Sequence, residues 1–169
     1  MTFKLSQRSL DKMEGVDENL VAVVKSAIHN TKVDFGVIYG LRTMEEQRKL
    51  VDAGKSQTMK SKHLDGRAVD LVAYIGSSVS WELNLYDEIA DAMKEGAEAA
   101  GVKIRWGAAW TIDDFGDYDG TAEHAMTSYI DTRRSQGRRP FIDAPHFELM
   151  PQDVTVKVDP LPSMSSRTQ

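Results

Sequence analysis

Apolar residues in the first third of the chain recur with two different periods, which predict a helix, a strand and a second helix. Residues 17–30 place apolar side chains at helical spacing, and residues 33–39 alternate as in a β-strand. Thr43 followed by Glu46 is a capping-box signature, which predicts a short helix ending near Gly54.

The middle of the chain predicts a loop, a strand and a long helix. Residues 55–66 are polar and indicate a loop, and residues 67–74 alternate as in a second strand. Ser80 could cap a helix that runs to Ala100, where Gly101 is well placed to end it.

The last third of the chain is less regular. Residues 102–106 and 145–150 suggest two further strands, and a short helix is expected at 122–130, but the rest of 111–140 shows no clear period. Strands and helices are interspersed without the regular rhythm of a parallel sheet. We therefore expect an α+β fold, with a small antiparallel sheet flanked by helices.

Length and charge narrow the class of protein. The chain has 169 residues, which predicts one domain over residues 1–150 and a tail over 151–169 that is partly disordered or packed on it. The net charge of −5 argues against broad binding to nucleic acid. No apolar run approaches the roughly 20 residues of a membrane span, and the N-terminus lacks a secretory signal. The protein either works in the cytoplasm or leaves it by a route that the sequence does not encode.

The absence of Cys limits the chemistry that the chain can perform. It excludes a disulfide scaffold, a Cys-ligated zinc or iron–sulfur site and a thiol nucleophile. Any transition-metal site must use some of the four His together with Asp or Glu.

The segment over residues 61–70 carries the most specific signal. Asp70 lies inside an apolar strand, where an unpaired carboxylate is costly to bury and a bound cation would relieve that cost. His63 is seven residues away, so the turn at Gly66 must bring the two side chains together.

A second His in an apolar strand, His146, follows Asp143 by three residues. Two His and one Asp leave the fourth position of a zinc ion open for water, as a catalytic zinc site requires. A carboxylate outside the ligand set can accept the proton of that water, and Asp143 is placed for this role.

These residues resemble a known family of enzymes. Ser-x-His-x-x-Gly-x-Ala-x-Asp at 61–70, with Asp-x-x-His at 143–146, resembles the VanY-type zinc peptidases of the D-alanyl-D-alanine carboxypeptidase group. That group includes D,D-dipeptidases of vancomycin resistance and bacteriophage L-alanyl-D-glutamate endopeptidases. Residues 39–43 and 105–110 are also similar to family segments, and the chain looks most like the single-domain phage endolysins.

The resemblance implies a role for each residue of the motifs. It makes His63, Asp70 and His146 the zinc ligands on the sheet, as in hedgehog-type domains and D,D-peptidases. It makes Asp143 the general base and Arg42 the group that steadies the substrate carbonyl and the oxyanion. Two further residues, Ser61 and Trp110, are candidates for substrate binding.

The resemblance also implies a function. The chain would be a monomeric phage endolysin that cleaves the L-alanyl-D-glutamate bond of peptidoglycan, reaching the periplasm through a holin-type partner that permeabilises the inner membrane. One alternative is a D,D-carboxypeptidase or D,D-dipeptidase that removes terminal D-alanine. Another is a catalytically silent zinc-bearing module that binds cell wall or protein.

Several polar residues leave alternatives open. Arg42 could pair with Glu45 or Glu46 at the start of the predicted helix instead of serving catalysis. His29 and His124 have no carboxylate at the motif spacing, so we expect both to be structural or exposed.

Two charged clusters and two aromatic residues are also ambiguous. The acidic residues at 113–119 could bind calcium or form a solvated loop. The four arginines between residues 133 and 139 could contact an anionic envelope, although such charge runs are usually solvated. Trp106 and Trp110 are typical core residues, but Trp110 could line a cleft if the following loop borders the site.

Overall fold

A computed structural model of the chain describes residues 2–56 and 58–152. Its centre is an antiparallel sheet in which β2 pairs with β1 along one edge. The other edge of β2 pairs with β5 in its first half and with β3 in its second half, and β4 extends the sheet beyond β5. The strands are β1 (Asp34–Tyr39), β2 (Ala68–Ile75), β3 (Ser78–Ser80), β4 (Ile104–Trp106) and β5 (His146–Leu149).

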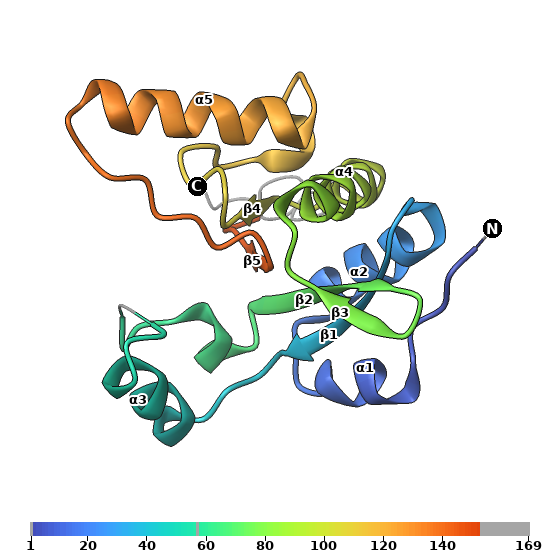
Figure 1. Cartoon of the computed structure of the whole chain (residues 1–169). Helices are drawn as coiled ribbons and strands as arrows, with labels where there is room; N and C mark the ends of the chain where they lie inside the picture. The colour runs from blue at the N-terminus through green and yellow to red at the C-terminus, as the bar shows by residue number, and fades with distance from the viewer. Residues whose placement is uncertain (1, 57, 153–169) are drawn as a thin grey trace, which may run out of the picture.

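Helices surround this sheet, so the predicted α+β fold is confirmed (Figure 1). The core forms where α2 and α4 pack on each other and on the sheet, because both helices carry an apolar stripe. No helix among the described residues is long and apolar enough to cross a membrane. The helices are α1 (Gln7–Lys12), α2 (Glu18–Asn30), α3 (Met44–Asp52), α4 (Leu83–Ala100) and α5 (Ala122–Ser135), with short 3-10 turns η1 (Lys62–Asp65) and η2 (Phe115–Asp117).

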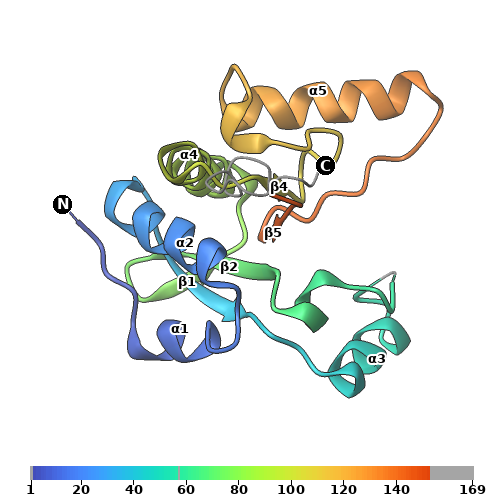
Figure 2. The same ribbon diagram turned by 180° about the vertical axis from the view of Figure 1, so that it is seen from behind.

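Two helices stand on opposite sides of the region where β2 begins. Figures 1 and 2 show α3 and its following loop at one side and α5 at the other, with β5 and the start of β2 between them. The register of the strands places Asp70 of β2 opposite His146 of β5, and opposite Tyr39 at the end of β1. The centre of the sheet therefore gathers residues that are distant in sequence.

The sequence missed or misplaced several elements. It did not predict α1 or β3, because both are short and polar. Ser80 does not cap α4 but ends β3, and α4 begins at Leu83 with Glu82 at the N-cap. Ser80 instead accepts a hydrogen bond from the Glu82 N–H at 3.3 Å.

Two further corrections concern regions whose apolar pattern is weak. The predicted loop at 55–66 contains the turn η1, and the helix expected at 122–130 extends to Ser135 as α5. Helix α5 buries only Ala122, Ala125, Met126 and Tyr129, so its apolar period is faint in the sequence. The prediction for the tail falls largely on residues 153–169, outside the described residues.

Candidate active site

The turn η1 fixes both the position and the tautomer of His63. The Ser61 hydroxyl caps the turn by accepting the His63 backbone N–H at 3.1 Å, and Gly66 ends it with φ of +70°. A Cβ at Gly66 would also collide with the carbonyl oxygen of Gly15, so only glycine fits there. The His63 ring is buried and its Nδ1–H donates to the Gly40 carbonyl at 2.8 Å. Its Nε2 faces the site, and in the neutral imidazole this is the nitrogen that carries the lone pair.

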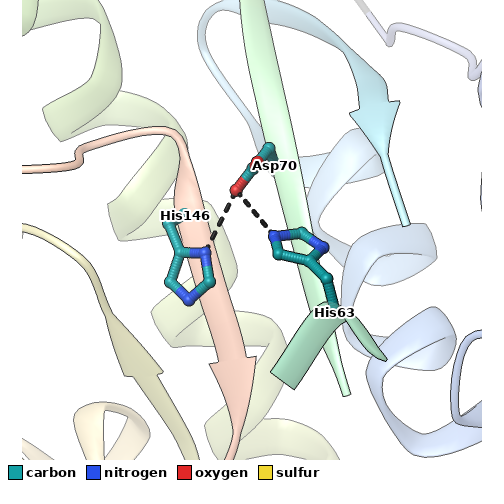
Figure 3. Close-up of side chains that lie close together, drawn as sticks. All are labelled: His63, Asp70 and His146. Atoms are coloured by element: carbon teal, nitrogen blue, oxygen red, sulfur yellow. Dashed lines mark hydrogen bonds and ion pairs between the residues drawn. The ribbon is translucent and has the colours of Figure 1, made fainter. Parts of the chain in front are cut away.

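Strand pairing brings the other two predicted ligands to the same point. Figure 3 shows the rings of His63 and His146 on either side of the Asp70 carboxylate. His63 Nε2 lies 3.2 Å and His146 Nδ1 lies 3.1 Å from the same oxygen, Asp70 Oδ1. The donor atoms of the three residues lie within 4.8 Å of one another. The structure thus brings together the three residues that the sequence motifs singled out.

The chemistry of these donors fits a metal ion. His63 Nε2 is buried and has no hydrogen-bond partner among the described residues, although Asp70 is near. The His146 Nε2–H donates to Glu148 Oε1 at 2.8 Å, which leaves His146 Nδ1 free to face Asp70. Two imidazole nitrogens and a carboxylate thus converge, and each ring is oriented by a hydrogen bond from its other nitrogen, as in metal sites. A metal ion bound there would displace the proton that His146 Nδ1 shares with Asp70.

The charges of the site are strongly coupled. Burial disfavours the charged form of His146, but hydrogen bonds to Asp70 and Glu148 outweigh burial and raise the pKa of His146 to about 9. Burial also disfavours ionised Asp70, but the hydrogen bonds and charges of the two imidazoles hold its pKa well below the usual range. The carboxylate stays ionised at neutral pH and available to a cation.

Asp143 lies beside these three residues, where its carboxylate is partly buried and close to the negative charge of Asp70. Burial and the negative charge of Asp70 raise the pKa of Asp143. Its backbone is fixed because its N–H donates to Gly107 at 2.8 Å and its carbonyl accepts the His146 N–H at 3.0 Å. A Cβ at Gly107 would collide with the Asp143 carbonyl, which explains the glycine after Trp106. A carboxylate with a raised pKa is suited to accept a proton.

Arg42 joins the site to α3 through Gln47, and forms no ion pair with Glu45 or Glu46. Its guanidinium donates to Gln47 at 2.7 Å and lies 3.5 Å from Asp70 Oδ2, and the side chain is only 8% exposed. Glu46, a partner considered from the sequence, instead completes the capping box with Thr43. Buried Arg42 Nε has no hydrogen-bond partner among the described residues, so the guanidinium retains an unused donor.

Glu148 is a site residue that the motif analysis did not single out. Its Oε1 accepts from His146, and its Oε2 accepts two N–H groups of Arg105 at 3.0 and 2.7 Å and lies 3.2 Å from Lys62 Nζ. These partners outweigh its burial and hold the pKa of Glu148 well below its usual range. Strand alternation, which puts His146 and Glu148 on one face, was the signal available in the sequence.

All seven predicted site residues line one cleft of about 670 Å³. Trp110 packs against His146 with ring centroids 5.4 Å apart, whereas Trp106 is fully buried in the core. His29 and His124 are both exposed and do not line the cleft, as expected. The lining residues from the prediction are Arg42, Ser61, His63, Asp70, Trp110, Asp143 and His146.

The calcium prediction finds no support. Among residues 2–56 and 58–152, His63, Asp70 and His146 form the one cluster of His and acidic side chains close enough to share a metal ion. The acidic residues at 113–119 do not converge in this way, and Asp113 instead lies 3.8 Å from Arg105. At least one of these carboxylates therefore has a cationic side chain of the protein as its partner.

A His–Asp–His set that could hold a metal ion, with a buried carboxylate and an arginine beside it in an accessible cleft, is typical of metal-dependent hydrolases. Residues 1–150 match the family model described as phage L-alanyl-D-glutamate peptidase, and the chain belongs to this family. The predicted family and its peptidase class are thereby confirmed.

Individual relatives agree with this assignment. The L-alanyl-D-glutamate peptidase of Escherichia phage T5 is 30% identical over 122 residues, which cover 70% of this chain and 88% of that protein. The L-alanyl-D-glutamate peptidase of Listeria phage A118 is 30% identical over 114 residues, 66% of this chain but 40% of that longer protein. The crystal structure of the Serratia marcescens L-Ala D-Glu endopeptidase ChiX matches with a TM-score of 0.65 and 34% identity, covering 87% of this chain and 90% of ChiX.

Proposed function

We propose that this chain is a zinc-dependent endopeptidase that hydrolyses the bond between L-alanine and D-glutamate in peptidoglycan stem peptides. The observation that carries the proposal is the convergence of His63 Nε2, His146 Nδ1 and Asp70 Oδ1 in an accessible cleft. The names of the T5, A118 and ChiX proteins support the choice of bond.

The three ligands of the proposed metal site are His63, Asp70 and His146. Zinc bound there would supply Lewis-acid chemistry, lowering the pKa of a water molecule toward about 7 and polarising the substrate carbonyl. Glu148 keeps the His146 ring oriented through its hydrogen bond to Nε2. Gly40 does the same for His63 through Nδ1.

Asp143 and Arg42 divide the remaining chemistry. Asp143, whose pKa is raised, accepts the proton of the attacking water and delivers it to the leaving amine of D-glutamate. Arg42 is held by Gln47 and Asp70, and its guanidinium steadies the negative oxygen that develops on the attacked carbonyl. Ser61 keeps η1 folded at one side of the cleft, and Trp110 provides an aromatic surface at the other.

The proposal extends to the biological setting. The chain acts as a monomer, and residues 1–150 form its single peptidase domain. It is synthesised in the host cytoplasm and reaches the wall after a holin-type partner permeabilises the inner membrane. If so, added protein lyses Gram-negative cells whose membranes have been permeabilised and leaves intact cells unharmed.

Mass spectrometry of digested Gram-negative peptidoglycan tests the reaction. The zinc-loaded wild type is expected to release peptides with a new amino terminus on D-glutamate, and Asp143→Asn is expected to release almost none. Release of free D-alanine instead would support a D,D-carboxypeptidase. Binding of zinc and cell wall without any released peptide would contradict peptidase function and support a silent binding module.

A further inference from the structure

One wall of the cleft is a continuous row of contacts that runs from the proposed metal site to α5. Trp110 packs against His146, and its ring stacks on Phe141 with centroids 6.1 Å apart. Both the Trp110 Nε1–H and the Tyr129 hydroxyl donate to the Phe141 carbonyl, at 3.1 and 3.2 Å. The guanidinium of Arg133 lies over the Tyr129 ring at 5.4 Å. We call these residues, Trp110, Tyr129, Arg133 and Phe141, the α5 wall.

Among the described residues, the neighbour of the Arg133 guanidinium in this wall is the aromatic ring of Tyr129 and not a carboxylate. Within residues 2–56 and 58–152, no acidic group lies within ion-pair distance of Arg133, and its buried Nε has no hydrogen-bond partner. The guanidinium nevertheless lines the cleft together with His63 and Asp143. Its neighbour Arg134 is exposed and does not line the cleft, so the two arginines occupy different environments.

The cleft as a whole carries more positive than negative side chains, although the chain has a net charge of −5. Asp70 and Glu148 are already paired with cations of the cleft, Arg42, Lys62 and Arg105. This leaves Arg133 on one wall, and Lys55 and Lys60 on the facing segment, without a carboxylate among the described residues. Such a surplus attracts an anionic ligand.

The proposed substrate supplies an anion close to the reacting bond. D-Glutamate provides the amino group of the cleaved bond and has two carboxyl groups, and a peptide chain continues through one of them. The other is not part of the peptide chain, and it is either an ionised carboxylate or, when amidated, an uncharged carboxamide. A planar guanidinium binds a carboxylate through two parallel N–H bonds, and it gains far less from an amide.

We propose that Arg133 binds the free carboxylate of the D-glutamyl residue and thereby selects carboxylate over carboxamide at that position. This inference rests on the proposed function and adds a specificity residue to it. The ring of Tyr129 shields one face of the guanidinium, and the hydrogen bonds of its hydroxyl to Phe141 keep that ring in place. Because Nε is buried, we assign the two terminal NH2 groups of Arg133 to the contact with the substrate carboxylate.

The test compares two soluble peptides that differ in one group, L-Ala-D-Glu with a free α-carboxylate or an α-carboxamide, each continued through the γ-carboxyl. For the wild type we expect kcat/KM to be about 10- to 100-fold higher for the carboxylate peptide, the effect of one charge-assisted contact. Arg133→Gln is expected to lose this preference, mainly through KM, with little change for the carboxamide peptide. Arg133→Lys, which keeps the charge without the planar fork, is expected to lie between them.

Arg134→Gln is the matched control, because it removes the adjacent, exposed arginine of the same helix and should keep the wild-type preference. Equal thermal melting of all variants would show that α5 is intact. If Arg133→Gln retained the wild-type ratio, or the wild type showed no preference, the inference would be wrong while the proposed function stood. If the wild type cleaved neither peptide nor peptidoglycan, the proposed function itself would fall, and this inference with it.

Discussion

The floor of the cleft, which we define as His63, Asp70, His146, Glu148 and the cations that contact them, differs from the α5 wall in how its charged side chains are paired. On the floor, Asp70 contacts two imidazoles and Arg42, and Glu148 contacts His146, Arg105 and Lys62. On the α5 wall, Arg133 has an aromatic ring beneath it and no carboxylate within reach among the described residues. Asp70 and Glu148 of the floor thus have cationic partners within the protein, whereas Arg133 of the α5 wall has no anionic partner among the described residues.

This difference is what we expect if the floor carries out the chemistry and the α5 wall selects the substrate. A floor whose ligands are oriented by hydrogen bonds is organised before substrate arrives, which is what a metal site and its chemistry need. A cationic side chain that has no anionic partner within the protein is suited to bind an anionic group of the substrate. Changes to the floor should therefore reduce activity on every substrate, whereas changes to the wall should alter which substrate is preferred.

The largest effect is expected from His63→Ala, which removes one of the three proposed ligands. Zinc content should fall far below one ion per chain, and kcat should drop by about 1000-fold or more, because the Lewis acid is lost. Zinc content is measured by elemental analysis, and cleavage by peptide release. His124→Ala is the matched control, since His124 is exposed on α5 and contacts Tyr118 instead of the site. Equal activity of the two variants would contradict the ligand assignment.

Asp143→Asn should separate chemistry from metal binding. The amide cannot accept a proton, so kcat should fall by about 100- to 10,000-fold while zinc content stays at the wild-type level. Asp119→Asn, an exposed residue outside the cleft, serves as control and should leave kcat unchanged. Full activity in a zinc-loaded Asp143→Asn protein would show that another group is the base.

Glu148→Gln should weaken the floor without removing a ligand. It replaces the carboxylate that orients His146 and leaves Arg105 and Lys62 without their anionic partner. Zinc affinity, measured by competition with a chelator, should decrease by about 10- to 100-fold, and excess zinc should restore much of the activity. A variant that bound zinc as tightly as the wild type would show that Glu148 does not position His146.

The smallest effect is expected outside the cleft, at Asp87 of α4. Burial, together with the charges of Glu123, Asp91 and Glu88, raises the pKa of Asp87 from 3.8 to about 6. The folded state therefore holds this proton more tightly than the unfolded state, which stabilises the fold below pH about 4. That contribution is lost as the pH rises through about 6.

Asp87→Asn should consequently stabilise the protein at pH 8 by about 1 kcal/mol, a rise in Tm of about 2–4 °C, and have little effect at pH 4. Thermal unfolding followed by circular dichroism at both pH values measures this difference. Asp131→Asn, an exposed position on α5, should shift Tm at neither pH. A stabilisation by Asp87→Asn that is equal at both pH values would contradict the titration of Asp87.

The sequence predicted the floor better than the wall, for a physical reason. Strand alternation and the turn at Gly66 limit where His63, Asp70 and His146 can point, and the antiparallel register then brings them together. Glu148 could have been found from the same alternation, because it shares the face of His146. Its ion pairs with Arg105 and Lys62 depend on tertiary contacts that no local pattern carries.

Apart from Trp110, the residues of the α5 wall were not predicted as site residues, because their signals are not periodic. Helix α5 buries only two alanines, Met126 and Tyr129, so its length was underestimated, and its arginines were indistinguishable from a solvated charge run. Only packing separates Arg133, over Tyr129, from exposed Arg134. Short polar elements such as β3 were missed because their pairing with a neighbouring strand, rather than their composition, makes them strands.

Anomalous diffraction at the zinc absorption edge, from crystals of the zinc-loaded protein, tests the central claim most directly. The hydrogen bonds of the two imidazoles predict one strong peak in contact with His63 Nε2, His146 Nδ1 and an oxygen of Asp70. A peak elsewhere in the molecule, or none at these three atoms, would contradict the account of the floor as a metal site.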